Sequence, residues 1–226
     1  MQFDRFKKLV GDNIFNNIQN KTVLIVGIGG VGGYALEAIV RSGINNIIIV
    51  DKDIIDITNL NRQIITTINN IGRPKVTIAK ERALSINPNL NIITHNIFLT
   101  QENIDEIITE NIDYVIDACD TIDTKKAIIT KCLKNNIKFI SCMGSANKFR
   151  PELLEITTLN KTSYDKLAKR LRKWAKDNNI KDNIPVVTSK EEVKSSAFLG
   201  STSFVPATAG LLCASYIIND IIKKGN

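Results

Sequence analysis

The chain has 226 residues, of which 43% are hydrophobic and 23% are charged, a composition typical of a soluble globular protein. This length allows one sizeable hydrophobic core, or a core with a small appendage. The formal net charge of +7 would favour a polyanionic partner such as nucleic acid. Lysine is abundant along the whole chain, however, so charge alone does not separate such a partner from a compositional bias.

The cysteine pattern argues against two common structural roles. The four cysteines include no C-x-x-C pair, which excludes a zinc site built on two such pairs, and their spacing does not suggest a disulfide framework. The N-terminal segment contains acidic residues and no long apolar run, unlike a secretory signal. No stretch reaches the ~18 uninterrupted apolar residues of a membrane span. We expect a soluble, cytoplasmic protein that does not cross a membrane.

Short apolar runs alternate with amphipathic segments between residues 22 and 143. Runs that are β-branched and apolar on both faces predict buried parallel strands at 22–26, 46–50, 90–95, 114–118 and 137–142. The intervening segments have helical spacing, at 31–42, 73–86, 101–110 and 123–136. Parallel strands joined through helices require right-handed crossovers. The pattern therefore predicts an α/β fold with a doubly wound, mostly parallel, Rossmann-like sheet.

The pattern changes after Met143. Further elements are expected in the order strand, amphipathic helix, strand, polar stretch and apolar helix, at 153–159, 163–178, 184–188, 189–203 and 207–222. No linker rich in Pro, Gly or Ser interrupts the chain, and no internal repeat is visible. We expect a single domain over 1–226, with an N-terminal helical arm (1–21), a core (22–143) and a C-terminal strand-and-helix elaboration (144–226).

A glycine-rich turn directly follows the first predicted strand and opens a helix. Gly27 permits a tight turn, Gly29 lets the backbone approach a phosphate or ribose, and Gly32 allows close packing of strand and helix. The helix N-terminus offers free N–H groups and the positive end of its dipole to an anion. This arrangement predicts a nucleotide-binding turn. Glycines that serve only the turn are the alternative.

Asp51 ends the second predicted strand, where a carboxylate can accept hydrogen bonds from both ribose hydroxyls of an adenosine. A nicotinamide-dependent dehydrogenase fits the glycine turn and this acid equally well.

Two cations and two amides follow Asp51 within 25 residues: Asn59, Arg62, Gln63 and Lys75. A dehydrogenase has no general need for these four residues, whereas a site that binds a triphosphate does. An arginine fork and a lysine ammonium neutralise oxygens that gain charge as pyrophosphate leaves. The alternative is a solvated surface pair.

Asp120 follows the fourth predicted strand in the segment DACD (117–120). Open α/β folds bind ligands at this edge of the sheet, so a carboxylate there could hold Mg²⁺ near phosphates. The alternative role for Asp120 is a helix N-cap.

The motifs GxGGxG, VDKDIIDITNLNRQ, GRPK and DACD resemble those of the E1-like activating enzymes of the ThiF/MoeB type, which adenylate carboxylates. Within that superfamily the chain is most similar to the tRNA threonylcarbamoyladenosine dehydratases. The segments SCMGSANKFRPELLEI, KTSYDKLAKRLRK and STSFVPATAGLL carry this closer resemblance. The resemblance covers nearly the whole chain, and it implies a nucleotide-binding core at 22–143 and a substrate side at 144–226.

The resemblance implies ATP and Mg²⁺ as cofactors and assigns roles to the matched residues. The residues expected to bind the nucleotide are Gly27, Gly29, Gly30, Gly32, Asp51, Asn59 and Gln63. The residues expected to act in catalysis are Arg5, Arg62, Lys75 and Asp120, with Asp120 also beside the magnesium. In relatives the arginine matched by Arg5 reaches the partner's ATP across a dimer, so a homodimer is expected. The chain departs from the commoner pattern at Gln2, Ala146 and Phe149-Arg150.

The remaining candidate nucleophiles and bases have no evident partners. Cys119 and Cys142 are expected at strand ends, and Cys132 and Cys213 in helices. None of them is placed beside a base that would lower its pKa, and the lone histidine, His95, lies in an apolar strand. Buried structural thiols are the expectation, so the acyl-AMP would be attacked directly, with no thioester.

The helix expected at 163–178 has a basic face opposite Leu167, Leu171 and Trp174. The residues on that face are Lys166, Lys169, Arg170, Lys173 and Lys176. Such a stripe could lie along tRNA phosphates. The alternative is a solvated face in a lysine-rich protein.

Taken together, the sequence favours an ATP-dependent dehydratase that adenylates the threonyl carboxylate of threonylcarbamoyladenosine in tRNA and closes a ring. One alternative is an E1-like enzyme that activates the C-terminus of a ubiquitin-like sulfur carrier. A sulfur-carrier or desulfurase partner is left open. The others are an NAD-dependent oxidoreductase and a nucleotide-bound partner protein without catalysis.

Overall fold

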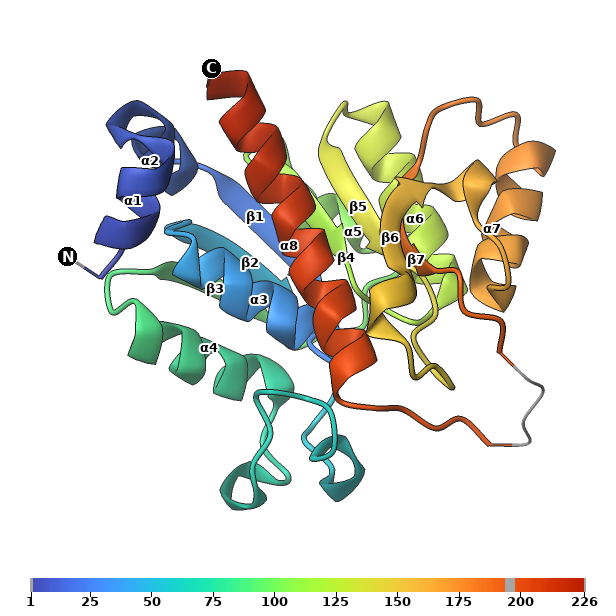
Figure 1. Ribbon diagram of the computed structural model, residues 1–226, viewed down its shortest axis with the longest axis horizontal. Helices are drawn as coiled ribbons and strands as arrows, with labels where there is room; N and C mark the ends of the chain where they lie inside the picture. Colours follow the sequence, from blue (N-terminus) through green and yellow to red (C-terminus); the bar gives the residue numbers. More distant parts are fainter. Residues whose placement is uncertain (1, 194–197, 226) are drawn as a thin grey trace.

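The computed structural model describes residues 2–193 and 198–225, which form a seven-stranded sheet in the order β3-β2-β1-β4-β5-β7-β6 (Figure 1). The strands are β1 Thr22–Val26, β2 Asn46–Val50, β3 Asn91–His95, β4 Tyr114–Asp117, β5 Lys138–Cys142, β6 Leu154–Thr158 and β7 Pro185–Ser189. Neighbouring strands are parallel, except that edge strand β6 pairs antiparallel with β7. The predicted α/β fold with a mostly parallel, doubly wound sheet is confirmed.

Helices cover both faces of the sheet. They are α1 Asp4–Val10, α2 Asp12–Gln19, α3 Gly32–Arg41, α4 Lys75–Ile86, α5 Ile104–Ile107, α6 Ile122–Lys134, α7 Lys166–Asp177 and α8 Phe204–Gly225. Single 3₁₀ turns lie at Ile57–Asn59, Ile68–Asn70, Pro151–Leu153 and Leu159–Lys161. The helices α2, α3, α4 and α8 pack on one face, and α5, α6 and α7 pack on the other.

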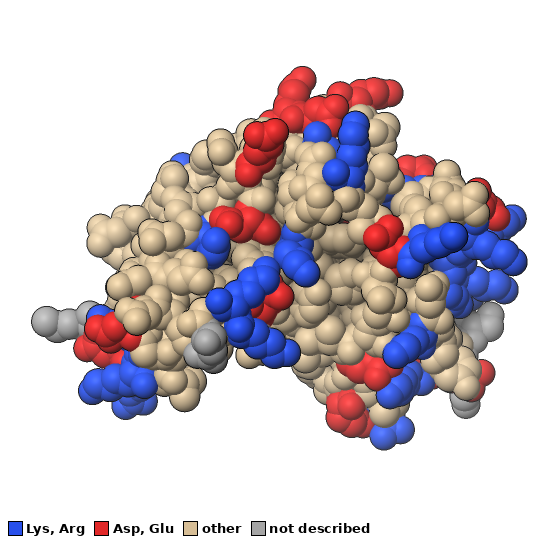
Figure 2. All heavy atoms as spheres, turned by 90° about the horizontal axis from the view of Figure 1, so that it is seen from above, with Lys and Arg blue, Asp and Glu red and all other residues tan. Residues whose placement is uncertain are grey.

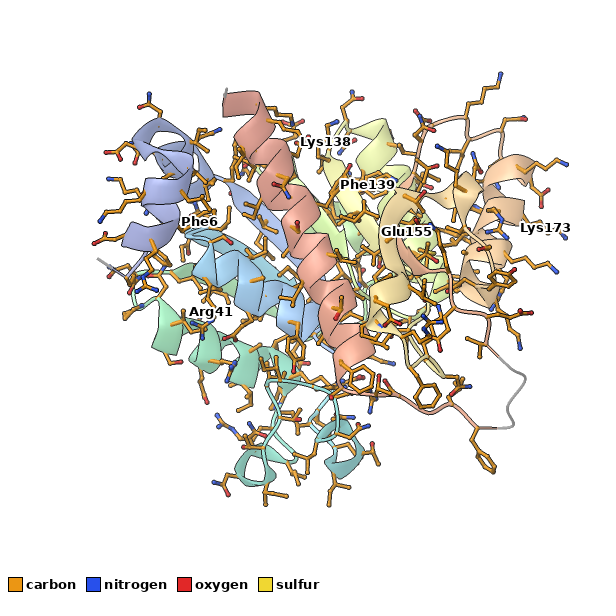
Figure 3. All side chains as sticks on the ribbon, in the orientation of Figure 1. Phe6, Arg41, Lys138, Phe139, Glu155 and Lys173 are labelled. Carbon is orange, nitrogen blue, oxygen red and sulfur yellow. The ribbon has the colours of Figure 1, made fainter. Side chains whose placement is uncertain are left out.

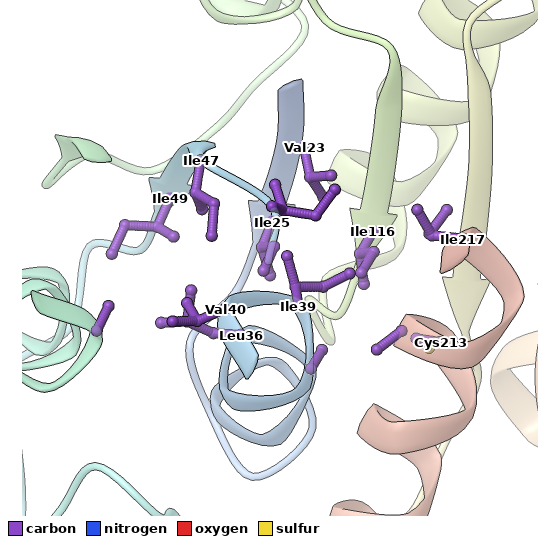
Figure 4. Packing of buried hydrophobic residues seen from close by; sticks show 14 of the residues in the cluster. Val23, Ile25, Leu36, Ile39, Val40, Ile47, Ile49, Ile116, Cys213 and Ile217 are labelled. Atoms are coloured by element: carbon purple, nitrogen blue, oxygen red, sulfur yellow. The ribbon is translucent and has the colours of Figure 1, made fainter. Parts of the chain in front are cut away.

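The alternation of β1 explains why the sheet needs both layers. Val23 and Ile25 point into the cluster formed with α3 and α8 (Figure 4), whereas Leu24 and Val26 point into the cluster formed with α5, α6 and α7. Successive side chains of a strand alternate between its faces, so a strand that is apolar throughout must be covered twice.

The strand order reverses between β1 and β4. The chain proceeds from β1 outward to β2 and β3, then returns to place β4 and β5 on the other side of β1. In open α/β sheets the crevice at such a switch point, beyond the carboxyl ends of the strands, is where ligands bind. The glycine turn follows β1, so it lies at this crevice.

The C-terminal helix α8 is a core helix of this domain. Its 22 residues are long and apolar enough to cross a membrane by length and composition alone. In the fold, however, nine of them are buried, and α8 packs along α3 and against the sheet (Figure 1). The backbone of α8 approaches α3 so closely that a Cβ at Gly210 would lie 2.2 Å from the carbonyl oxygen of Val31.

Several expected elements differ in extent. The helix expected at 101–110 is only Ile104–Ile107, because Asn103 binds the backbone of Thr100 and Phe98 in a turn and the chain leaves the helix at Ile108. The helix α4 begins at Lys75 because Pro74 favours a helix start and disfavours a helical residue before it. Residues 194–197 of the expected polar stretch lie outside the described residues.

Strand β3 is not buried on both faces as expected. It is an edge strand with a single neighbour, and the side chain of Ile93 is 47% exposed.

Candidate functional site

A pocket of about 330 Å³ lies at the carboxyl ends of β1, β2 and β4. It brings together most of the residues predicted for the site: Gly27, Gly29, Gly30, Asp51, Asn59, Arg62, Gln63, Lys75 and Asp120. Two predicted residues do not line it, Gly32 and Arg5.

The glycine turn is held by its backbone against the neighbouring strands. Gly27 has φ +88° and donates its N–H to the carbonyl of Val50 at 2.8 Å. A Cβ at Gly32 would lie 1.7 Å from the carbonyl oxygen of Gly27, so Gly32 supports the packing of α3 on β1 from outside the pocket. A Cβ at Gly29 would meet only the Gln63 amide, at 3.8 Å. The space beside Gly29 is therefore open to a ligand.

The Asp51 carboxylate is fixed beside this turn by backbone donors. One oxygen accepts from the N–H of Ile28 at 2.6 Å, and the other accepts from the N–H of Asp53 at 2.8 Å. A carboxylate offers about four acceptor sites, so each oxygen keeps a lone pair for a ribose hydroxyl.

The segment after β2 folds back so that its cations face the pocket. Arg62 donates from Nη1 to the carbonyl of Thr58 and to Oδ1 of Asn61, both at 2.9 Å. Lys75 is only 5% exposed, and its ammonium pairs with Asp53 at 2.8 Å. Both positive groups line the pocket. The burial of Lys75 argues against the alternative of a solvated surface residue at that position.

Gln63 provides a buried hydrogen-bond acceptor in the wall of the pocket. Its side chain is buried in the pocket wall, and Oε1 accepts no hydrogen bond from the described residues. A buried acceptor without a partner costs about 1–3 kcal/mol, so a polar ligand that donates to it would bind with that gain. Together with the open space beside Gly29, this fits a nucleotide.

Asp120 also lines the pocket and is exposed. It is not the N-cap of α6, since that position is Thr121. Among the described residues there is no group of three acidic, histidine or cysteine side chains that could hold a metal. Mg²⁺ commonly takes one or two carboxylates together with substrate phosphates, so Asp120 fits a magnesium ion that arrives with a nucleotide.

A buried ion pair under the pocket was not predicted. Lys125 and Asp117 are fully buried, with Lys125 Nζ 3.0 Å from both carboxylate oxygens of Asp117 and 3.3 Å from Oγ of Ser141. Burial alone would lower the pKa of Lys125, but the Asp117 carboxylate raises it above its usual range. The pair anchors the end of β4, from which the chain turns behind Gly27.

Several pocket residues were missed by the sequence analysis. Lys52 lies over the ring of Phe98 at 4.6 Å, and the distant segments contribute Ser145, Ser201 and Pro206. The VDKD motif could have indicated Lys52. Nothing in the spacing of the sequence indicates which residues of the last 80 approach the glycine turn.

Comparison with known proteins decides the family, because the model of the ThiF family matches residues 3–226. The chain belongs to the ThiF family. It is 37% identical over 241 residues to the tRNA threonylcarbamoyladenosine dehydratase of Bacillus subtilis, covering 98% of this chain and 95% of that relative. It is 32% identical over 215 residues to the enzyme of the same name from Escherichia coli, covering 94% and 78%.

Solved structures agree with this membership of the ThiF family. Crystal structures of the E. coli tRNA N6-threonylcarbamoyladenosine dehydratase in complex with AMP and with ATP superimpose with a TM-score of 0.94. Each is 31% identical and covers 99% of this chain and 94% of that chain. The resemblance to the E1-like enzymes is thereby confirmed.

The cysteines of this ThiF-family chain are poorly suited to accept an acyl group. Cys119 lines the pocket, but burial raises the pKa of its thiol well above the usual value, and the Asp117 carboxylate raises it further. Burial also raises the pKa of Cys132 to about 12. Cys142 and Cys213 are buried in the core.

Arg5 does not line the pocket of its own chain. Its neighbour Phe6 lines a groove with Ile222 near the end of α8, whereas Pro206 at the start of α8 lines the nucleotide pocket. The same groove is also lined by Leu211, nearer the start of α8. The contact of Arg5 with the nucleotide of a partner copy stays a prediction.

The basic face of α7 is exposed as expected. Its five predicted cations are solvent-exposed, while Leu171 and Ala175 are buried. Blue side chains gather at the right-hand end of the molecule, over α7 (Figure 2), and Lys173 points away from the sheet (Figure 3). The remaining helix cation, Arg172, is turned inward and binds Thr162.

Proposed function

We propose that this chain is an ATP-dependent cyclising dehydratase that acts on threonylcarbamoyladenosine in tRNA. The observation that carries the proposal is the pocket in which Arg62 and Lys75 face the open side of the glycine turn. A nicotinamide needs no such pair of cations, whereas a departing pyrophosphate does. The names of the ThiF-family relatives supply the acyl substrate.

In the proposed reaction, Asp51 holds the ribose and the open backbone at Gly29 and Gly30 backs the nucleotide. The threonyl carboxylate attacks the α-phosphorus of ATP, and the bond to pyrophosphate breaks. Arg62 and Lys75 stabilise the charge that gathers on the leaving group, with Asn59 and Gln63 as neutral donors. Mg²⁺, when bound beside Asp120, would neutralise phosphate charge.

Ring closure completes the dehydration. An atom of the same side chain attacks the carbonyl carbon of the acyl-AMP, and AMP leaves with one oxygen of the former carboxylate. The sum is loss of water from the side chain and conversion of ATP to AMP and pyrophosphate. The enzyme contributes orientation, because both reacting groups belong to one bound nucleoside.

The proposal also gives a role to each of the other parts of the chain. Residues 22–143 bind the nucleotide, residues 144–226 face the acyl substrate, and 1–21 form an arm. The stripe on α7 contacts tRNA phosphates. Arg5 completes the pocket of a partner copy in a cytoplasmic homodimer, which is consistent with its absence from the lining of the pocket of its own chain.

Pyrophosphate release tests the substrate. Release should require ATP, Mg²⁺ and tRNA that carries the modification, and omission of any one should abolish it. Equal release with unmodified tRNA would refute the substrate. Formation of an acyl-adenylate on a sulfur-carrier protein would favour the second E1-like hypothesis, and tighter binding of NAD than of ATP would favour an oxidoreductase.

A further inference from the structure

An exposed aromatic ring lies close to the substrate side of the pocket. Phe149 is 69% exposed, although burial of such a ring is worth about 1.5–3 kcal/mol. The adenylation mechanism gives it no role. Phe198 and Leu199 are exposed as well, at 82% and 88%.

The backbone that carries Phe149 is fixed. The Glu191 carboxylate accepts from the N–H of Phe149 at 3.0 Å and from the N–H of Arg150 at 2.9 Å. Arg150 in turn binds Glu152 through its side chain at 2.7 Å. A ring on a backbone held in this way loses little conformational freedom when it binds a partner.

Asn147 joins the segment of Phe149 to that of Phe198 and Leu199. Its backbone N–H donates to the carbonyl of Gly200 at 2.9 Å, and its side-chain amide donates to the carbonyl of Phe198 at 3.1 Å. The three exposed residues, Phe149, Phe198 and Leu199, are here named the apolar rim. Ser145 and Ser201, a few residues from either part of the rim, both line the pocket. Both segments of the rim therefore lead, within four residues, to side chains that line the pocket.

The rim is also connected to the basic helix α7. Asp165, the N-cap of α7, accepts from the N–H of Gly144 and from the N–H of Ala168, at 2.9 and 2.8 Å. Lys148, directly before Phe149, is buried and pairs with the same carboxylate at 3.4 Å. The segment that carries Phe149 is thus tied to the first turn of α7, the helix that carries the exposed basic stripe.

We propose that Phe149 stacks on an unpaired base adjacent to the modified adenosine of the bound RNA, an inference that rests on the proposed function. An adenosine whose side-chain carboxylate enters a recessed pocket must leave its stack, and its neighbour loses a stacking partner. An aromatic ring replaces that partner without reading sequence, and nearby cations take the phosphates. We assign the apolar rim to single-stranded RNA and not to a protein partner. A purely apolar protein contact would not explain the basic stripe on the adjoining helix α7.

Three variants at one position separate stacking from simple hydrophobic contact. Phe149→Ala should weaken the binding of modified tRNA about 5- to 140-fold, as expected for one lost base stack. Phe149→Leu should restore little of it, whereas Phe149→Trp should bind as the wild type does. The affinity for ATP should not change in any of them. Ile68→Ala, which removes another exposed apolar side chain (68% exposed) outside the pocket, should bind tRNA normally.

The fluorescence of 2-aminopurine placed next to the modified adenosine reports stacking directly. Binding to the wild type should quench the fluorescence of the 2-aminopurine. At a saturating concentration of the Phe149→Ala protein, the fluorescence of the bound probe should stay high. Normal tRNA binding and quenching by Phe149→Ala would overturn the stacking proposal while leaving the proposed function intact. If the wild type bound no modified tRNA, both would be overturned. Loss of dimer mass in light scattering, with unchanged tRNA affinity, would assign the rim to a protein contact and overturn it as well.

Discussion

Lys75 and Asp53 are joined twice at the edge of the nucleotide pocket. The ammonium of Lys75 lies 2.8 Å from Oδ2 of Asp53, and its backbone N–H donates to the carbonyl of Asp53 at 2.9 Å. The lysine side chain is 6% exposed and the aspartate side chain is 49% exposed. The first turn of α4 is thereby fixed to the end of β2, with its cation directed at the pocket.

Lys75→Met should lower ATP–pyrophosphate exchange by about 10²–10³-fold, as expected when one donor to a developing charge is removed. The affinity for ATP should fall less, because the ammonium interacts most strongly with the departing pyrophosphate. Lys80→Met, on the same helix but outside the pocket, is the matched control and should exchange at the wild-type rate. Unchanged exchange in Lys75→Met would remove Lys75 from the mechanism.

Two glycines of the turn should respond differently to alanine. A Cβ at Gly32 would lie 1.7 Å from the carbonyl oxygen of Gly27, and backbone cannot yield there. Gly32→Ala should therefore lower the melting temperature strongly or prevent folding. A Cβ at Gly29 has open space, so Gly29→Ala should melt within a few degrees of the wild type and bind ATP at least ten-fold more weakly, by about 1.4 kcal/mol. Tight ATP binding by Gly29→Ala would mean that the nucleotide does not approach this backbone.

The elements that the sequence predicted well are those whose pattern is set by burial on both faces. The strands at 22–26 and 46–50 have the predicted bounds, because an apolar, β-branched run between turns has few alternatives. The segment 101–110 was overestimated since its isoleucines have near-helical spacing, yet Ile108 and Ile112 are buried outside any helix. Local periodicity does not distinguish a helix from a loop that packs on one.

In the candidate site, too, some residues could be predicted from the sequence and others could not. Arg62 and Lys75 were predicted because they follow β2 in one short segment, and the fold can bring such a segment only to the adjacent crevice. Ser145 and Ser201 come from loops beyond β5 and β7, and their approach to the glycine turn depends on how the C-terminal elaboration packs. The pairing of Lys125 with Asp117 likewise follows from the packing of α6 on β4, which no motif records.

Cys119 is expected to be dispensable for the chemistry. Its thiol donates to Asp117 at 3.0 Å, and burial keeps its pKa well above neutrality, so little thiolate is available to attack an acyl-AMP. Cys119→Ala should retain pyrophosphate release within about three-fold of the wild type. Mass spectrometry of the wild type during turnover should find no acyl thioester. A thioester that disappears in Cys119→Ala would restore the mechanism of the E1-like enzymes that use cysteine.

Removal of one member of the buried Lys125–Asp117 pair should strongly destabilise the fold. Lys125→Met leaves the Asp117 carboxylate uncompensated in the core, which should cost about 3–5 kcal/mol in the free energy of unfolding. Asp117→Asn in the same chain removes the buried charge, so the double variant should be more stable than Lys125→Met alone. Urea denaturation measures both. A double variant that loses the sum of the two single effects would show that the residues do not interact.

Glu37 on α3 should make the stability of the domain depend on pH below neutrality. Its carboxylate binds Arg82 of α4 at 2.7 Å and Arg41 at 2.8 Å. Burial alone would raise the pKa of Glu37, but the hydrogen bonds and charges of the two arginines lower it below the usual value of 4.5. A lowered pKa in the folded state means that the unfolded state binds the proton more readily. The contribution to stability is therefore complete above the unfolded pKa and is lost as the pH falls through the folded one.

Glu37→Gln isolates this contribution. At pH 7 the variant should be less stable than the wild type by about 1 kcal/mol, the upper end for solvent-screened pairs, which lowers the melting temperature by about 2–4 °C. As the pH falls from about 5 to about 3, a range that spans the ordinary pKa of a glutamate, the two melting temperatures should converge, because the wild-type carboxylate becomes protonated. Glu106→Gln is the control and should follow the wild type at every pH, since Glu106 is an exposed carboxylate on α5 that pairs with no arginine in the described part of the chain. A difference between Glu37→Gln and the wild type that stays constant down to about pH 3 would show that packing of the Glu37 side chain, and not its charge, links α3 to α4.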